Sequence, residues 1–185
     1  MGVGTGRTGK RCSGFSLVEL AIAIVVLVVA LGGLSGTVVS TARLARANEQ
    51  RALADEALRR LAAELHVTPF GDIFAAYNTD PADDPDGPNT GPGGAFDVQG
   101  LRPLLDDPDG AVGAIVFPTM VEAGDLQLRE DVALPELGMP RDLNGDGVDA
   151  LDHSDDYLVL PVSLEIEWLG SGGVSRSRMD LILVE

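Results

Sequence analysis

An uninterrupted apolar run near the N-terminus most constrains how this chain folds. From Leu17 to Val39 the residues are aliphatic, small or hydroxyl-bearing, and Glu19 is the only charged side chain among them. As a helix with a rise of about 1.5 Å per residue, this run extends about 35 Å, which is enough to cross the hydrocarbon core of a bilayer. A core helix of a soluble domain is the alternative, but such a helix is rarely apolar on every face over this length. We therefore expect a transmembrane helix over about residues 17–39.

The residues before the run set the expected orientation in the membrane. Arg7, Lys10 and Arg11 precede it, and the first fourteen residues contain no Asp or Glu. Positive flanking charge favours a cytoplasmic N-terminus, so the rest of the chain should cross the inner (cytoplasmic) membrane once, into the periplasmic or extracellular space. An ordinary secretory signal has a shorter apolar region followed by a small-residue cleavage site, whereas here the small residue Gly14 comes first.

The junction between the basic leader and the apolar run has a recognisable order of residues. It reads Gly14, Phe15, Ser16, Leu17, Val18 and Glu19. This order resembles the type IV prepilin family, which includes type IV pilins and the pseudopilins of type II secretion, and the resemblance covers roughly residues 7 to 40. It implies that residues 1–14 are a leader peptide, that a prepilin peptidase cuts between Gly14 and Phe15, and that the new Phe15 amine is methylated. The chain would be the substrate of that enzyme.

Glu19 needs a partner or a polar purpose. A carboxylate near the start of a membrane helix costs on the order of a few kcal/mol. Cleavage after Gly14 would create a cationic amine on Phe15, one helical turn away, which can pair with Glu19 of the same or a neighbouring subunit. In the family this pairing is associated with the register of assembly. The alternative is that Glu19 extends to the lipid headgroups without further function.

Beyond Val39 the helix is expected to continue and to become amphipathic over residues 40–66. Apolar residues recur at spacings of four, three and four at Ala54, Leu58, Leu61 and Leu65, which is typical of one buried helix face. Pro69 and Gly71 should end the helix. The predicted organisation is therefore a leader over 1–14, a helix over 15–66 and an extracytoplasmic β domain over 67–185.

The end of the chain predicts a β-hairpin. Apolar and polar residues alternate between Leu158 and Glu185, around a turn at Gly170–Gly173. If Leu169 lies opposite Val174, Glu167 falls opposite Arg176 and Glu165 opposite Arg178, so both pairs have opposite charge. Further strands are expected at residues 114–117 and within 125–134, and residues 78–94 read as an exposed or mobile loop rich in Asp, Pro and Gly. The expected fold class is α+β and pilin-like, with a long helix on an antiparallel sheet of about four strands.

An acidic loop gives a candidate metal site. Asp142, Asn144 and Asp146 alternate and are followed by Gly147, as at the start of an EF-hand-type calcium loop. Asp149 and Asp152 are the candidates for further ligands. The loop departs from the EF-hand pattern at position twelve, where His153 replaces the bidentate Glu. Ca²⁺ is thus the candidate cofactor, and a merely solvated acidic turn is the alternative. Related pseudopilins use calcium in their C-terminal region, which by resemblance favours binding.

Composition and the remaining motifs narrow the function. The formal net charge of −16 is unsuited to nucleic acid, because phosphates need basic surface. The single cysteine, Cys12, lies in the leader, and His66 and His153 stand apart from any nucleophile motif, so no enzyme is expected. The expected function is that of a structural subunit that assembles with other pilin or pseudopilin subunits into a type II secretion pseudopilus or a type IV pilus. The alternative is a signal-anchored, calcium-binding extracytoplasmic domain that does not polymerise.

Overall fold

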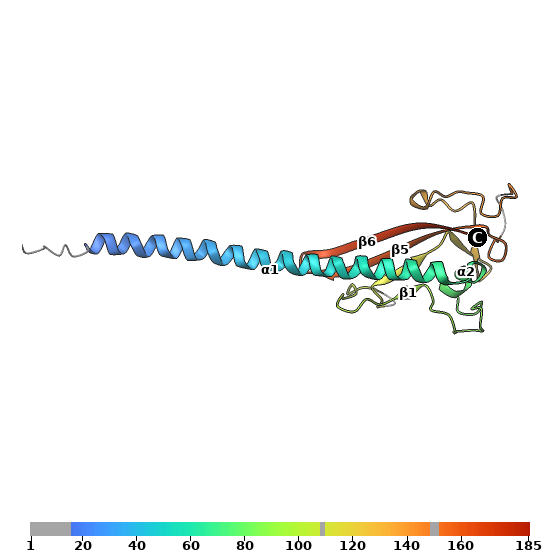
Figure 1. The fold of residues 1–185 in the computed structure, drawn as a ribbon, viewed down its shortest axis with the longest axis horizontal. Coiled ribbons are helices and arrows are strands. Elements are labelled where there is room, and N and C mark those ends of the chain that lie inside the picture. The colour runs from blue at the N-terminus through green and yellow to red at the C-terminus, as the bar shows by residue number, and fades with distance from the viewer. Residues whose placement is uncertain (1–15, 108–109, 149–151) are drawn as a thin grey trace, which may run out of the picture. The chain divides into compact units, whose positions relative to one another are not determined.

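The computed structural model describes residues 16–107, 110–148 and 152–185, and it confirms the α+β class (Figure 1). The chain forms two compact units, Met1–Leu44 and Ala45–Glu185, and α1 contributes to both. The elements are α1 (Leu17–Val67), the 3₁₀ turn η1 (Phe70–Asp72), α2 (Ile73–Tyr77), β1 (Ala95–Phe96), β2 (Gly113–Val116), β3 (Thr119–Glu122), β4 (Asp125–Leu128), the 3₁₀ turn η2 (Pro135–Leu137), β5 (Val159–Gly170) and β6 (Gly173–Val184).

The first unit consists of the apolar part of α1. Its large side chains are exposed all round the helix, from Leu17 at 84% to Val39 at 52%. Soluble monomers rarely expose continuous apolar surface on this scale. Within the described residues, α1 is the one helix that is long and apolar enough to cross a membrane. Its length and composition therefore fit a single-pass membrane anchor.

In the second unit, α1 buries one face. Its buried residues are Ala54, Ala57, Leu58, Ala62 and Leu65, and Leu61 is partly buried against the same core. These positions recur at the spacing of a single helix face, so the predicted apolar stripe is confirmed. The helix ends at Val67, where Thr68 donates from its backbone N and its Oγ1 to the carbonyl of Glu64, just before Pro69, which has no N–H to continue the ladder.

The main sheet has the order β1-β2-β5-β6 and all its neighbours are antiparallel. The side chains on one face of β5 are buried in the same core as the α1 stripe, and they are Leu160, Val162, Leu164, Ile166 and Trp168. Figure 1 shows β5 and β6 running alongside the second half of α1. Ser177 of β6 donates to Asp55 Oδ1 of α1 at 2.8 Å, which adds a polar link between sheet and helix.

The hairpin register is the predicted one. Leu169 lies opposite Val174, Glu167 opposite Arg176 and Glu165 opposite Arg178. The two charged pairs form ion pairs of 2.9 and 3.4 Å. Exposed pairs of this kind contribute only about 0–1 kcal/mol each, so they select the register more than they stabilise the sheet.

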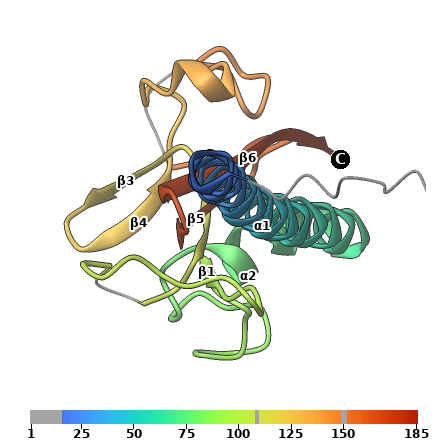
Figure 2. The same cartoon turned by 90° about the vertical axis from the view of Figure 1, so that its left-hand side faces the viewer.

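The β3–β4 ribbon forms a separate two-stranded sheet (Figure 2). The strand expected within residues 125–134 ends at Leu128, and β3 was not predicted. Immediately after β4, Arg129 pairs with Asp131 at 2.8 Å and with Glu122 at the end of β3 at 3.0 Å. These contacts join the two ends of the ribbon.

The loop over residues 78–94 lacks helix and strand, as expected, but it is not simply exposed. Asn78 is 4% and Asp84 is 8% exposed. Thr90 N donates to Asp84 Oδ2, and Asn78 Nδ2 donates to Asp83 Oδ2, both at 2.8 Å. The expectation of an exposed loop thus holds for most of these residues but not for Asn78 and Asp84, because local hydrogen bonds allow these polar side chains to be buried.

We predict that Leu58→Ala lowers the free energy of unfolding by about 2–5 kcal/mol, because it leaves a cavity at a side chain that is 1% exposed. Unfolding of the full chain in detergent can be followed by fluorescence of Trp168, which is the only tryptophan and is 3% exposed. Leu105→Ala, at a side chain that is 90% exposed, is the control and should change stability by less than about 0.5 kcal/mol. Equal effects of the two substitutions would contradict the packing described.

We predict a pH-dependent role for Asp131. The hydrogen bond from Arg129 lowers the pKa of the Asp131 carboxyl below its ordinary value. A carboxyl with a lowered pKa in the folded state stabilises the fold above the unfolded-state pKa of about 3.9, and this contribution is lost as the pH falls through the folded-state pKa. The midpoint temperature of unfolding of Asp131→Asn should therefore lie below the wild-type value at pH 7 and approach that value near pH 3. Asp125→Asn, at a carboxylate outside the described ion pairs, should show no such convergence.

Candidate functional site

Ser16 and Glu19 form the N-terminal cap of α1. Ser16 Oγ accepts a hydrogen bond from Glu19 N at 3.2 Å, and Ser16 O accepts from Leu20 N at 3.1 Å. Ser16 is thus the N-cap, and Ser-x-x-Glu is the sequence pattern of a capping box. The sequence interpretation used Ser16 only as part of the cleavage motif and missed this capping signal. Gly14 and Phe15 lie outside the described residues, so the pairing of Phe15 with Glu19 stays a prediction.

Glu19 is exposed and is the one acidic residue in the first turn of α1. A negative charge at this end of a helix is favoured by the helix dipole, by about 0.3–1 kcal/mol. That gain is smaller than the cost of a few kcal/mol for a carboxylate in hydrocarbon. Among the described residues no ion pair includes Glu19. The carboxylate therefore remains available to a cation.

The acidic loop brings three of the predicted metal ligands together. Asp142 accepts from the backbone N of Gly145 and of Gly147, whose φ values of 82° and 72° favour glycine. Asn144 Nδ2 donates to Asp146 Oδ2 at 3.2 Å and to Asp156 Oδ2 at 2.9 Å. The hydrogen bond from Asn144 is the main cause that lowers the pKa of Asp156. Asp156 was not among the predicted ligands, and it closes the loop from the side where position twelve lacks a carboxylate.

The other two predicted ligands are not brought into this group by the described contacts. Asp149 lies outside the described residues. Asp152 Oδ1 accepts from Leu128 N at 3.2 Å and from Ser154 N at 3.1 Å, so it fastens the loop to β4. Over the described ranges, no group of three or more His, Cys, Asp or Glu side chains is placed to hold a metal ion. Calcium binding therefore stays a prediction based on the chemistry of the donors.

A buried acid–base pair lies beneath the acidic loop. Glu130 is 1% and His153 is 3% exposed, and Glu130 Oε2 lies 3.7 Å from His153 Nε2. Glu130 Oε1 accepts from Leu143 N, and His153 Nδ1 lies 3.0 Å from Asp156 Oδ1. The pair thus ties both ends of the loop to the core. Sequence reasoning noted His153 at position twelve of the calcium loop and as standing apart from any nucleophile motif, and it had no signal for Glu130.

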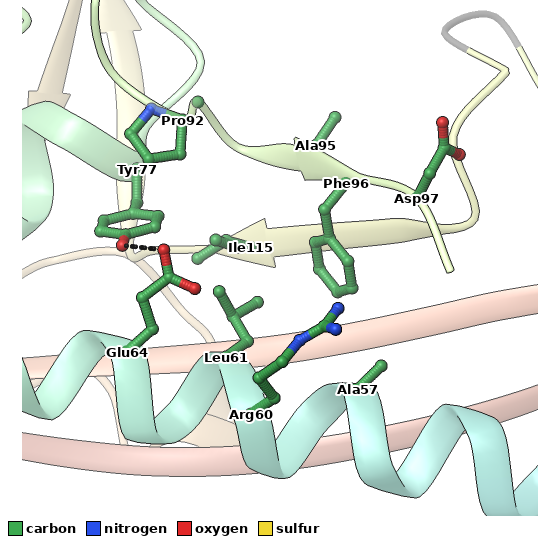
Figure 3. Close-up of a pocket in the computed structure, with 11 residues that line it drawn as sticks. Ala57, Arg60, Leu61, Glu64, Tyr77, Pro92, Ala95, Phe96, Asp97 and Ile115 are labelled. Carbon is green, nitrogen blue, oxygen red and sulfur yellow. Dashed lines mark hydrogen bonds between the residues drawn. The ribbon is translucent and has the colours of Figure 1, made fainter. Parts of the chain in front are cut away.

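A small pocket lies between α1 and the β1–β2 edge of the sheet (Figure 3). It encloses about 140 Å³, below the roughly 300 Å³ at which small-molecule sites begin. Tyr77 donates from its hydroxyl to Glu64 Oε1 at 3.2 Å on one side, and Phe96 and Arg60 lie on the other. Burial is the main cause that raises the pKa of Tyr77. The lining combines apolar side chains, including Leu61 and Ile115, with the charged side chains of Arg60, Glu64 and Asp97.

Comparison with protein families identifies the N-terminal segment. Residues 9–35 match the family described as the prokaryotic N-terminal methylation motif. The chain carries the type IV prepilin-like signature. The match includes Gly14, Phe15 and Glu19 and ends within the apolar run, so it does not extend to the β domain. Comparisons with curated proteins and with solved structures found no match.

The signature and the fold together give a coarse assignment. A prepilin motif implies processing by a peptidase and association with pilin subunits and the membrane. Together with the apolar part of α1, it indicates a pilin- or pseudopilin-like precursor with a single-pass anchor. The motif suggests a structural subunit rather than an enzyme.

Proposed function

We propose that this protein is a pilin-like structural subunit that is cut by a prepilin peptidase between Gly14 and Phe15, methylated on Phe15 and assembled into a type II secretion pseudopilus or a type IV pilus. Before assembly it spans the inner membrane once, with a cytoplasmic N-terminus and a periplasmic or extracellular β domain. Its partners are the peptidase and other pilin or pseudopilin subunits.

One observation carries this proposal. The methylation motif runs directly into a helix whose apolar side chains are exposed on every face and whose only charge in that run is Glu19. A lone anchor needs apolar surface but no carboxylate, whereas a helix that joins an assembly of like helices can use Glu19 to bind the terminal amine of a neighbour. The signal-anchored domain that never polymerises is the competing function, and an uncut leader would favour it.

The decisive experiment combines terminal analysis with a charge-deletion variant. Mass spectrometry of the protein from membranes of its native host should show a chain that begins at N-methylated Phe15. Glu19→Ala should be processed to the same terminus but be absent from sheared filaments, because it lacks the carboxylate that binds the neighbouring amine. Glu49→Ala, at an exposed acid of α1 beyond the apolar run, is the matched control and should assemble.

Two outcomes would count against the proposal. A chain that still carries residues 1–14 would favour the non-polymerising anchor. Normal incorporation of Glu19→Ala into filaments would refute the role given to Glu19, while leaving the processing assignment intact.

As a second role, we propose that the acidic loop binds Ca²⁺. The support is chemical, since Asp142, Asn144 and Asp146 supply oxygen ligands in one glycine-containing turn, and Asp156 adds a carboxylate beside Asn144. Calcium would hold this loop against the strand that follows it.

The calcium proposal predicts a metal-dependent stability. With the dissociation constant of about 10⁻⁴–10⁻³ M that extracellular modules show, about 10 mM Ca²⁺ should stabilise the domain by about 1.4–2.7 kcal/mol relative to chelator. Asp142→Asn/Asp146→Asn should abolish the shift, whereas Asp86→Asn/Asp97→Asn, with the same change in charge, should retain it. An equal shift in both variants would identify general screening of acidic surface instead.

A further inference from the structure

We propose that Arg46 and Arg51 of α1 dock against the acidic β domain of a second copy of this chain. The inference rests on the proposed assembly and adds the surface through which extracytoplasmic parts of neighbouring copies meet. We call residues 45–53 of α1 the stalk, because they precede Ala54, the first buried residue of the helix.

The stalk presents positive charge without a partner of its own. Arg46 and Arg51 are exposed, and Glu49 is the only acid between them. Among the described residues no ion pair or side-chain hydrogen bond involves either arginine, even though Asp55 follows Arg51 by one turn. Asp55 instead accepts a hydrogen bond from Ser177. In residues 67–185, by contrast, three of the five arginines are in described ion pairs, namely Arg129, Arg176 and Arg178.

The complementary surface is on the chain itself. Residues 45–185 contain 28 acidic and 9 basic side chains. Exposed carboxylates outside the described ion pairs include Asp86, Asp97 and Asp106. Two such acidic domains side by side repel each other. If one copy is displaced along the helix axis, its acidic domain lies beside the stalk of the other copy and is attracted to the stalk arginines. Charge therefore favours an axial displacement between neighbouring copies.

Phospholipid headgroups fit this surface less well. Arg46 follows Val39, the end of the apolar run, by seven residues and Arg51 follows it by twelve. At about 1.5 Å per residue these arginines lie about 10 and 18 Å along the helix from that end. A headgroup layer is only about 5–8 Å thick on each side of the hydrocarbon core. Arg51 therefore lies beyond the headgroup layer.

The next arginines along α1 provide a matched control. Arg59 and Arg60 are also exposed and absent from the described ion pairs. However, they lie between Ala57 and Ala62, where α1 packs on its own domain, so they are outside the stalk. Replacing Arg46 and Arg51 removes two positive charges inside the proposed interface, and replacing Arg59 and Arg60 removes two positive charges outside it.

The experiment places a photo-crosslinking amino acid at Asn48, an exposed stalk position, in the full chain within its native membrane. We expect a crosslinked dimer whose second peptide maps within residues 67–185. Arg46→Gln/Arg51→Gln should lower its yield about three- to tenfold, as expected for two ion pairs, and added NaCl should lower it likewise. Arg59→Gln/Arg60→Gln should leave the yield unchanged.

A second probe at Val29, in the apolar run, separates this inference from the proposed assembly. Dimers from Val29 without dimers from Asn48 would overturn the docking surface and leave the assembly intact. Absence of dimers from both probes would overturn both proposals. The docking surface would also be overturned by crosslinks from Asn48 to lipid or to a different protein. A dimer yield that is unchanged by Arg46→Gln/Arg51→Gln would overturn it as well.

Discussion

The burial of α1 against β5 is the contact on which the rest of the second unit depends. Leu58 of the helix and Leu164 of the strand are 1% and 0% exposed in one shared core. The strands β1 and β2 cannot form such a core alone, because they have two and four residues, and small isolated ribbons are marginal in water. Fixing α1 on β5 therefore positions β1, β2 and the loops between them. The same helix also carries the membrane run, so the fold of the domain and its anchoring begin from one element.

The sequence predicted those parts of the fold that several local signals specify together. In the β5–β6 hairpin, alternation, a glycine turn and opposite charges at Glu165 and Arg178 all select one register, and the structure has that register. It did not predict β1, which has only two residues, or β3, which has no buried side chain to give an alternating pattern. Polar burial was missed for a different reason. The burial of Asp84 and Glu130 depends on hydrogen bonds to Thr90 N and Leu143 N, and composition alone assigns both carboxylates to the surface.

In the candidate site too, residues close in the sequence were predicted, and contacts between distant residues were not. The cleavage and assembly residues are contiguous in the chain, so their motif is visible in the sequence, and the family comparison supports it over residues 9–35. The acidic loop depends on contacts between distant residues. Asp152 was expected to turn inward as a ligand, but it bonds to Leu128, which lies 24 positions earlier. Asp156 meets Asn144 from beyond the expected end of the loop. Spacing alone cannot assign these partners, because the β4 strand and the buried Glu130–His153 pair decide which carboxylate faces the loop.

Backbone amides, rather than cations, satisfy many acidic residues of this domain. Asp84, Asp142, Asp146 and Asp152 each accept hydrogen bonds from backbone N–H groups. Such bonds stabilise a carboxylate without neutralising it, so loops with many acidic residues can fold while the surface keeps its negative charge. Both arginines of the main sheet, Arg176 and Arg178, are in ion pairs with acidic residues of the same sheet. The exposed stalk arginines, Arg46 and Arg51, are then the counterpart that we propose for this negative surface on a second molecule.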